Sequence, residues 1–433
     1  MSLTGDVPQF PGYDHQAGGS VDDQVATRLL ARATDLVSIP SISRNEGQIA
    51  DYVYNTIESR LEGSTTTLPP VELIRLDGNN VVYRTMGKRA NRIVLASHID
   101  TVPPSGSGRS GGTGTNGSGD AGSGVSGDHG HDGSDVGSGG SSEVHAEGQL
   151  PTYVDDGTLY GLGAVDTKGS VAIMLDLLLF GRLPAIELTF IFYSCEEVSR
   201  NENGLRQILE TRPELLHGDV AIVGEPSGGY VEAGCQTTMT ATITFHGARA
   251  HTARPWTGTN AIHAIAPVID RIARYQENLV DLDGCTFREQ LQAVAVNGGI
   301  ASNVVPDLAS VTANHRAAPH RSRQELEQWL TEYAIQDTTG SLIVDDYAQG
   351  ALPALSNPWI KRLVEITGRP PRAKLGWTDV ATFAEAGIPA CNFGPGDPEL
   401  AHTPHERVSA AELVSARSAL VSLISAGTSS GNA

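Results

Sequence analysis

Short apolar segments typical of β-strands alternate with helical patterns along most of this 433-residue chain, and this alternation restricts the folds available to it. Five segments have the length and composition of strands, at residues 71–76, 80–84, 92–97, 187–193 and 219–223. Apolar residues recur at helical spacing in three further segments, at residues 26–37, 168–180 and 410–424. We therefore predict an α/β domain with a largely parallel central sheet.

The pattern changes over residues 238–245, where threonines alternate with apolar residues. This period of two predicts a strand of an antiparallel sheet with one buried face. The elements expected after it are a helix at 262–273, strands at 292–297 and 308–314, a helix at 323–333 and a strand at 341–345. The order βαββαβ predicts a small two-layer α+β domain, residues 231–346, inserted between two parts of the larger domain, residues 1–230 and 347–433.

Residues 105–148 differ in composition from both predicted domains, with 16 Gly and 10 Ser among 44 residues. Such a segment has few large apolar side chains whose burial could offset the entropy lost on ordering. We expect it to be a flexible loop inserted in the larger domain.

The acidic balance of the chain restricts its partners. It has 30 Lys and Arg against 50 Asp and Glu, a formal net charge of −20, so nucleic acid and anionic membrane surfaces would be repelled. The four cysteines lack the paired spacing of a disulfide framework or a zinc ribbon, which fits a reducing cytoplasm. No signal peptide or transmembrane helix is expected, because the longest apolar run, residues 173–180, is too short.

Residues able to bind a metal follow several of the predicted strands. His98 and Asp100 come directly after the strand at 92–97, at the sheet edge where α/β proteins bind ligands. Being two residues apart, they share one side of an extended chain. Asp100 is therefore suited to orient the imidazole of a metal-bound His98, although such a pair is also common in ordinary loops.

Carboxylates occur in three further loops. Asp166 lies in a glycine-rich loop before a predicted helix, where it could also serve only as a helix cap. Glu196 and Glu197 follow the fourth predicted strand, and Glu225 follows the fifth. Adjacent glutamates repel one another unless cations hold them, so these loops point to a cation site.

Two histidines near the C-terminus, His402 and His405, could complete the set. Histidine, aspartate and glutamate without thiolates suit a catalytic pair of zinc ions with open positions, which cobalt or manganese could also occupy. Together the loops predict a metal-dependent hydrolase. A metal-binding protein without catalysis is the alternative, and the presence of Glu196 beside Glu197 counts against it.

Four of these segments, at residues 97–103, 163–169, 196–197 and 224–226, resemble the metal-site motifs of one family in the same order. This is the family of dinuclear zinc amidohydrolases and exopeptidases that includes acetylornithine deacetylase, aminoacylase, carboxypeptidase G and succinyl-diaminopimelate desuccinylase. The similarity covers the whole chain except residues 105–148. It implies a zinc-exopeptidase-like catalytic domain with a mixed central sheet and an inserted, ferredoxin-like lid and dimerisation domain.

The resemblance implies five ligands for two Zn²⁺ ions. One ion would be held by His98 and Glu225, the other by Glu197 and His402, and both by Asp166. His405 is three residues beyond His402 and is the alternative ligand. The family's histidine precedes a short polar turn before the last helix, which favours His402.

The resemblance also implies roles for residues other than the metal ligands. Glu196 would be the general base, and Asp100 the carboxylate behind His98. His251, in the lid-domain motif at residues 247–255, would reach the active site of a partner subunit and stabilise the oxyanion. A homodimer formed through the lid domain is therefore expected.

Within the family, residues 302–306, 314–316 and 376–379 are most similar to the succinyl-diaminopimelate desuccinylases. This implies hydrolysis of N-succinyl-LL-2,6-diaminopimelate to succinate and LL-2,6-diaminopimelate, on the route to lysine. The residues expected to bind this substrate are Asn303, Arg316, Thr378 and Arg254. The alternative is another N-acyl-amino-acid deacylase, such as an acetylornithine deacetylase, or a dipeptidase of the same family.

Overall fold

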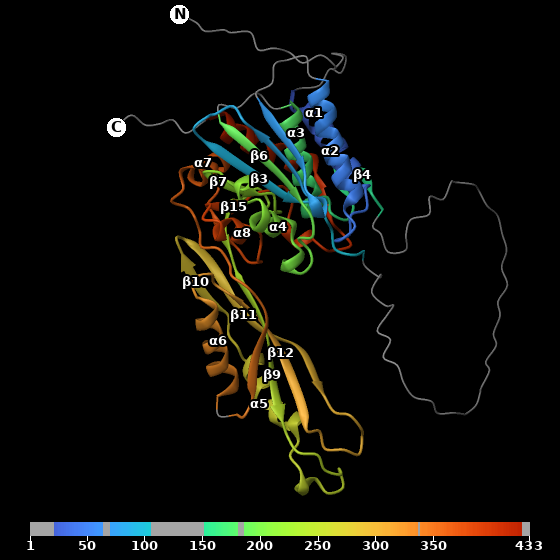
Figure 1. The fold of residues 1–433 in the computed structure, drawn as a ribbon, viewed down its shortest axis with the longest axis vertical. Coiled ribbons are helices and arrows are strands. Elements are labelled where there is room, and N and C mark those ends of the chain that lie inside the picture. The colour runs from blue at the N-terminus through green and yellow to red at the C-terminus, as the bar shows by residue number, and fades with distance from the viewer. Residues whose placement is uncertain (1–20, 64–69, 105–150, 181–185, 337, 427–433) are drawn as a thin grey trace, which may run out of the picture.

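The computed structural model describes residues 21–63, 70–104, 151–180, 186–336 and 338–426. The expected flexible loop at 105–148 lies outside these residues. The described chain forms a larger unit on an eight-stranded mixed sheet and a smaller unit on a five-stranded antiparallel sheet (Figure 1). This architecture confirms the predicted fold class, while the division at residues 230 and 347 stays a prediction.

The middle of the large sheet consists of parallel strands. β3 (Arg92–His98) pairs in parallel with β6 (Glu187–Tyr193) on one side and β7 (Val220–Val223) on the other, and β15 (Ala390–Asn392) continues beyond β7. Helices cover both faces of these strands, which explains why their sequences are continuous apolar runs rather than alternating ones.

Antiparallel pairs make the sheet mixed rather than largely parallel. The order is β1-β2-β6-β3-β7-β15-β8-β14, and the edge strands are β1 (Val71–Arg75), β2 (Val81–Thr85), β8 (Glu232–Cys235) and β14 (Arg372–Lys374). The pairs β1–β2, β2–β6 and β8–β15 are antiparallel, while β14 pairs with β8 in parallel. A separate three-stranded sheet contains β4 (Tyr153–Asp155), β5 (Thr158–Tyr160) and β16 (Arg407–Ser409).

Helices form a hydrophobic core on each face of the sheet. Ile93 and Leu95 of β3 contribute to one core, and Val94 and Ala96 contribute to the other. The first core contains α1 (Val21–Val37), α2 (Gly47–Glu62), α3 (Gly169–Phe180), α7 (Pro358–Thr367) and α9 (Ala410–Ala426). The second contains α4 (Gly204–Thr211) and α8 (Val380–Glu385).

The smaller unit has the predicted ferredoxin-like core with one additional strand. Its elements are β9 (Thr237–His246), α5 (Ala261–Ala273), β10 (Asn278–Leu282), β11 (Cys285–Gly298), β12 (Leu308–Ala317), α6 (Arg323–Leu330) and β13 (Ser341–Ala348). The sheet order is β10-β11-β12-β9-β13, which without β10 is the ferredoxin-like order. The predicted order βαββαβ is present, and β10, which forms a hairpin with β11, is an additional strand that was not predicted.

That hairpin has a physical signal in the sequence. Leu282 pairs with Cys285, which leaves a two-residue loop of Asp283 and Gly284. Both loop residues have positive φ, at 52° and 79°, as the tight turns of β-hairpins require. The strand expected at 292–297 therefore begins seven residues earlier, at Cys285.

The smaller unit extends from one end of the larger one (Figure 1). The chain passes from β8 in the large sheet directly to β9 in the small sheet, with only Gln236 between them. The loop after β9, yellow-green in Figure 1, lies at the end of the small unit that is remote from the large one. Among the described residues, no helix combines the length and apolar character needed to cross a membrane.

Candidate metal centre

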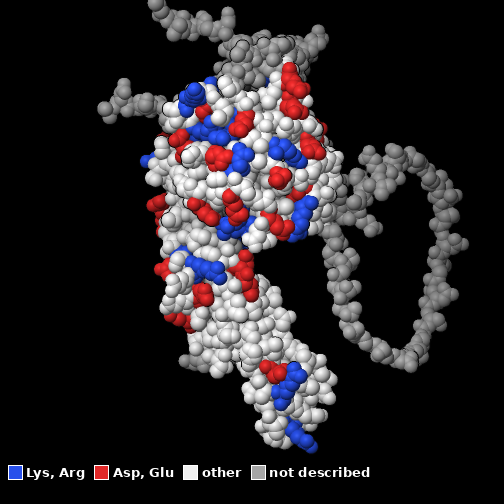
Figure 2. Space-filling view, viewed as in Figure 1, with Lys and Arg blue, Asp and Glu red and all other residues white. Residues whose placement is uncertain are grey.

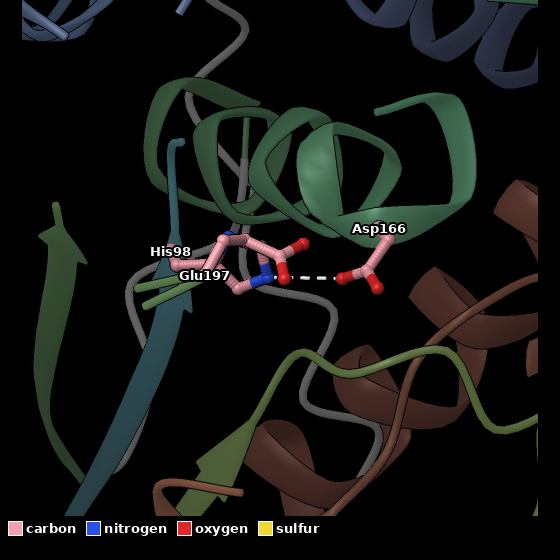
Figure 3. A group of neighbouring side chains, drawn as sticks. All are labelled: His98, Asp166 and Glu197. Carbon is pink, nitrogen blue, oxygen red and sulfur yellow. Dashed lines mark hydrogen bonds and ion pairs between the residues drawn. The ribbon is translucent and has the colours of Figure 1, made fainter. Parts of the chain in front are cut away.

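The predicted ligand loops meet at the carboxyl edge of the central strands. β3 ends at His98, Glu197 follows β6, and Asp166 lies just before α3. One potential ligand atom from each of these three side chains lies within 4.8 Å of the other two. Figure 3 shows the imidazole of His98 facing the carboxylate of Asp166, with Glu197 beside it. These residues could hold a metal ion.

The carboxylate of Asp166 lies between two groups of side chains. Its Oδ1 is 2.9 Å from Nε2 of His98, and its Oδ2 is 3.4 Å from Nε2 of His402. Glu225 Oε1 lies 3.9 Å from the same nitrogen of His98, and Glu197 Oε1 lies 2.8 Å from that of His402. The two groups, joined by one carboxylate, correspond to the two sets of ligands expected from the sequence.

Glu406, to which the sequence motifs assign no role, fixes the loop that carries Asp166. Glu406 is buried, and its Oε1 accepts hydrogen bonds from the backbone N–H groups of Val165 and Asp166, at 3.0 and 3.1 Å. Gly163 begins this loop with φ of 84°, and a Cβ there would lie 2.8 Å from Thr101 Cγ2. The glycine is therefore required by both conformation and space.

Asp100 connects the His98 loop to the glutamate loop. Its Oδ1 lies 3.4 Å from Nδ1 of His98 and accepts the backbone N–H of Glu196 at 3.0 Å. Its Oδ2 accepts the N–H of Glu197 at 3.1 Å and the hydroxyl of Ser43 at 2.7 Å. Burial would raise the pKa of Asp100, but the bonds with His98 and Ser43 lower it. The backbone carbonyl of Asp100 lies 3.1 Å from the same Nδ1 of His98, so Asp100 contacts the imidazole and binds the N–H groups of both glutamates.

Burial and like charges make the centre unfavourable for its own carboxylates. Burial raises the pKa of Glu196 well above its usual range, His98 opposes this, and Glu225 and Glu197 raise it further. Burial likewise raises the pKa of Glu225 to about 7, against the effect of Lys374. The Oε1 atom of Glu225 is buried without a hydrogen-bond partner. Cations would relieve both costs, so the donor set fits a pair of divalent metal ions.

His402 joins the centre and His405 does not. Hydrogen bonds with Asp166 and Glu197 raise the pKa of His402 to about 10, although its side chain is 47% exposed. His405 is exposed, and its backbone N–H donates to Thr403 Oγ1 at 3.3 Å. This arrangement supports His402 as the ligand.

The predicted residues of the smaller unit do not join the metal centre of their own chain. His251 pairs with Val304, and the backbone N–H of Thr252 donates to the carbonyl of Asn303 at 3.0 Å. Arg254 lies in the same exposed loop. This loop follows β9 and lies at the remote end of the smaller unit (Figure 1).

The other two predicted substrate-binding residues lie elsewhere. Arg316, near the end of β12, donates from Nε to Asn314 Oδ1 at 3.2 Å, and burial lowers its pKa. Thr378 is buried in the larger unit and donates from its hydroxyl to Asn392 Oδ1 at 2.9 Å. One chain alone therefore does not gather the four residues expected to bind substrate.

A mixed α/β sheet with two donor groups joined by one carboxylate, and with a ferredoxin-like second unit, defines a class of metal-dependent hydrolases. Residues 144–426 match the family described as "Peptidase family M20/M25/M40". The chain belongs to this family.

Curated relatives match most of the chain. A protein of Corynebacterium glutamicum named succinyl-diaminopimelate desuccinylase is 39% identical over 380 residues, which cover 86% of this chain and 89% of that one. A Mycobacterium tuberculosis protein assigned to the same enzymes is 42% identical over 385 residues, covering 88% and 93%. The resemblance inferred from the motifs is thereby confirmed.

Solved structures share the fold at low identity. Aminopeptidase PepT of Bacillus cereus superposes with a TM-score of 0.66 at 19% identity, covering 92% of this chain and 98% of that one. A Bacillus subtilis protein described as a dinuclear metal-binding peptidase superposes with a TM-score of 0.59 at 16% identity, covering 93% and 98%. These likenesses concern the fold.

Proposed function

We propose that the protein hydrolyses the amide bond of N-succinyl-LL-2,6-diaminopimelate and releases succinate and LL-2,6-diaminopimelate, with two Zn²⁺ ions per subunit. The observation that carries this proposal is Asp166, whose two oxygens face His98 on one side and His402 on the other. Identity of 39–42% to named desuccinylases over nearly their whole length supports the choice of substrate.

Five residues of the chain would hold the two metal ions. His98, Asp166 and Glu225 would hold one ion, and Asp166, Glu197 and His402 the other. When bound, the two ions would polarise the amide carbonyl and lower the pKa of the attacking water. Co²⁺ or Mn²⁺ could take their place.

Glu196 is the group in this centre that can carry a proton between the reactants. Its backbone is fixed by Asp100, which leaves its side chain free to act beside the ligands. A carboxylate beside the ligands can act as a general base that accepts the proton of water and then protonates the leaving amine at nitrogen. Asp100 contributes by orienting His98 and does not touch the substrate.

A second subunit would complete the site. His251 at the remote end of the smaller unit would reach the partner's metal centre and stabilise the oxyanion of the tetrahedral intermediate. The smaller unit offers an interface for this: β10 pairs with β11 only as far as Glu289, and beyond it Val294, Val296 and Ile300 are 58%, 53% and 64% exposed. Few charged residues occur on the visible middle of this unit (Figure 2). An uncharged edge of this kind favours pairing with a second copy.

Four residues would recognise the carboxylates of the substrate. Arg254 and Asn303 lie in the loops beside His251, so they would act together with it from the partner subunit. Thr378 lies in the larger unit, and Arg316 lies near the end of β12, opposite the start of β9. Both would bind the substrate from the chain that supplies the metal ligands. This division explains why the four residues are dispersed in one chain.

Steady-state kinetics on a panel of substrates tests the proposal. The panel contains N-succinyl-LL-2,6-diaminopimelate, N-acetylornithine, other succinylated and acetylated amino acids, and simple dipeptides. We expect kcat/KM for the first compound to exceed that for N-acetylornithine by about 100-fold or more, since polar groups placed for a second carboxylate discriminate strongly. Higher kcat/KM for N-acetylornithine or a dipeptide would instead identify another enzyme of the family. Treatment with a chelator should abolish activity, and Zn²⁺ should restore it.

A further inference from the structure

A line of alternating charges leads from the surface to the candidate ligand Glu225. Arg372 Nε lies 3.1 Å from Glu232 Oε1, and Lys374 Nζ lies 3.4 Å from Glu232 Oε2. The same ammonium lies 3.7 Å from Glu225 Oε2. Strands β14 and β8 at the edge of the large sheet supply the first three residues of this line. None of these three residues was assigned a role by the sequence motifs.

Lys374 is buried at this position. Its side chain is 12% exposed, and those of Glu232 and Glu225 are 6% and 8% exposed. Placing an ammonium there is costly unless carboxylates surround it, and here two of them do. Lys374 also donates to the backbone carbonyl of Pro226 at 3.2 Å, so it contacts both the side chain and the main chain of the Glu225 loop.

The contact leaves the two oxygens of Glu225 in different environments. Oε2 faces Lys374, whereas Oε1 is buried without a hydrogen-bond partner and lies 3.9 Å from Nε2 of His98. Without the lysine, the carboxylate could rotate or offer both oxygens to one ion. With the lysine, only Oε1 is available on the side of the metal centre.

We propose that Lys374 is a positioning residue that holds Glu225 as a single-oxygen ligand of the metal ion shared with His98 and Asp166. Glu232 supplies the charge that keeps the ammonium in place. The inference rests on the proposed metal binding, but it does not depend on the identity of the substrate. A failure of the substrate assignment would therefore leave it intact.

The test measures the affinity of each of the two metal sites for Co²⁺. Metal-free protein is titrated with Co²⁺, and the absorption bands of the two sites are assigned with the variants Glu225→Gln and Glu197→Gln. We expect Lys374→Met to weaken the site affected by Glu225→Gln by about 10- to 100-fold, as is typical when a group behind a ligand is lost. The site affected by Glu197→Gln should change by less than about threefold on the same reasoning.

Arg372→Met is the matched control. It removes one positive charge from the same strand and the same partner, Glu232, but it does not contact Glu225. We expect both affinities to stay within about threefold of the wild-type values, because the group behind Glu225 is retained. Equal weakening in Arg372→Met and Lys374→Met would show a general effect of charge and would overturn the proposal.

A second variant protects the test against misfolding. If Lys374→Met leaves the buried carboxylate of Glu232 with Arg372 as its only cation and does not fold, Lys374→Met combined with Glu232→Gln removes that buried charge. The double variant should show the same selective loss at the Glu225 site. Unchanged affinity at that site, or weakening of the Glu197 site instead, would refute the role of Lys374. Wild-type protein that binds fewer than two ions would refute the proposed function itself.

Discussion

The position of His251 allows a direct test of whether each active site is built from two subunits. His251 and Asn303 lie in neighbouring loops at the end of the smaller unit that is remote from the metal centre of the same chain (Figure 1). We predict that His251→Ala and Glu196→Ala each inactivate the homodimer, and that mixing the two variants restores activity. His251→Ala should lower kcat much more than it raises KM, because it removes charge stabilisation in the transition state.

The two-fold symmetry of a dimer determines how much activity the mixed variants should recover. In a dimer of one His251→Ala chain and one Glu196→Ala chain, one site lacks both groups. The other site combines an intact Glu196 with the partner's His251. An isolated heterodimer should therefore have about half of the wild-type activity, and a randomly exchanged equal mixture about a quarter.

The assay uses chains with two different affinity tags, so that heterodimers can be purified and their composition verified. No activity in a verified heterodimer would refute the reasoning. A second heterodimer, in which a wild-type chain is paired with a chain that carries both substitutions, distinguishes action across the interface from action within one chain. If His251 acts across the interface, this dimer is inactive, because its only intact Glu196 faces the partner's substituted position 251. If His251 acts within its own chain, the wild-type site keeps about half of the activity.

Three further predictions follow from the described contacts. Glu196→Ala should retain both metal ions but lose about 10²–10⁴-fold in kcat, whereas Glu197→Ala should lose one ion; elemental analysis showing the reverse would exchange their roles. Asp176→Ala should lower the free energy of unfolding by about 3 kcal/mol in urea titrations, because this buried carboxylate pairs with arginines of two other helices; a loss below 1 kcal/mol would contradict this. Burial lowers the pKa of His315 to about 4, below its usual 6.5, so the unfolded chain binds more protons and stability falls as the pH drops through this range. His315→Gln should remove up to about 3 kcal/mol of that pH dependence, and a pH profile that matches the wild type would disprove the assignment.

The sequence located the loops of His98, Glu197 and Glu225 because each follows a buried, largely apolar strand. The burial of β3, β6 and β7 on both faces makes their ends visible as the point where polar residues begin. Sequence patterns could not find Glu406 or Lys374. Glu406 contacts Asp166 across 240 residues, and Lys374 contacts Pro226 across 148, so only the folded sheet brings them together.

Two elements with local sequence signals were also missed. Helix α2 was not predicted, although its buried residues Ile49, Ala50, Val53 and Ile57 recur at helical spacing. Strand β10 was not predicted although Asp283 and Gly284 form a recognised hairpin signal.

The candidate metal ligands and the residues expected to act on the substrate lie partly in different units of the chain. All five candidate ligands lie in the larger unit, on loops fixed by the sheet, by Asp100 and by Glu406. The residues expected to act on the oxyanion and on one end of the substrate lie at the far end of the smaller unit. Metal content should therefore depend on the larger unit alone, whereas kcat and substrate preference should respond to both. Changes in the loop at His251 can then alter specificity without disturbing the ions, since no described contact of that loop reaches the ligands in its own chain.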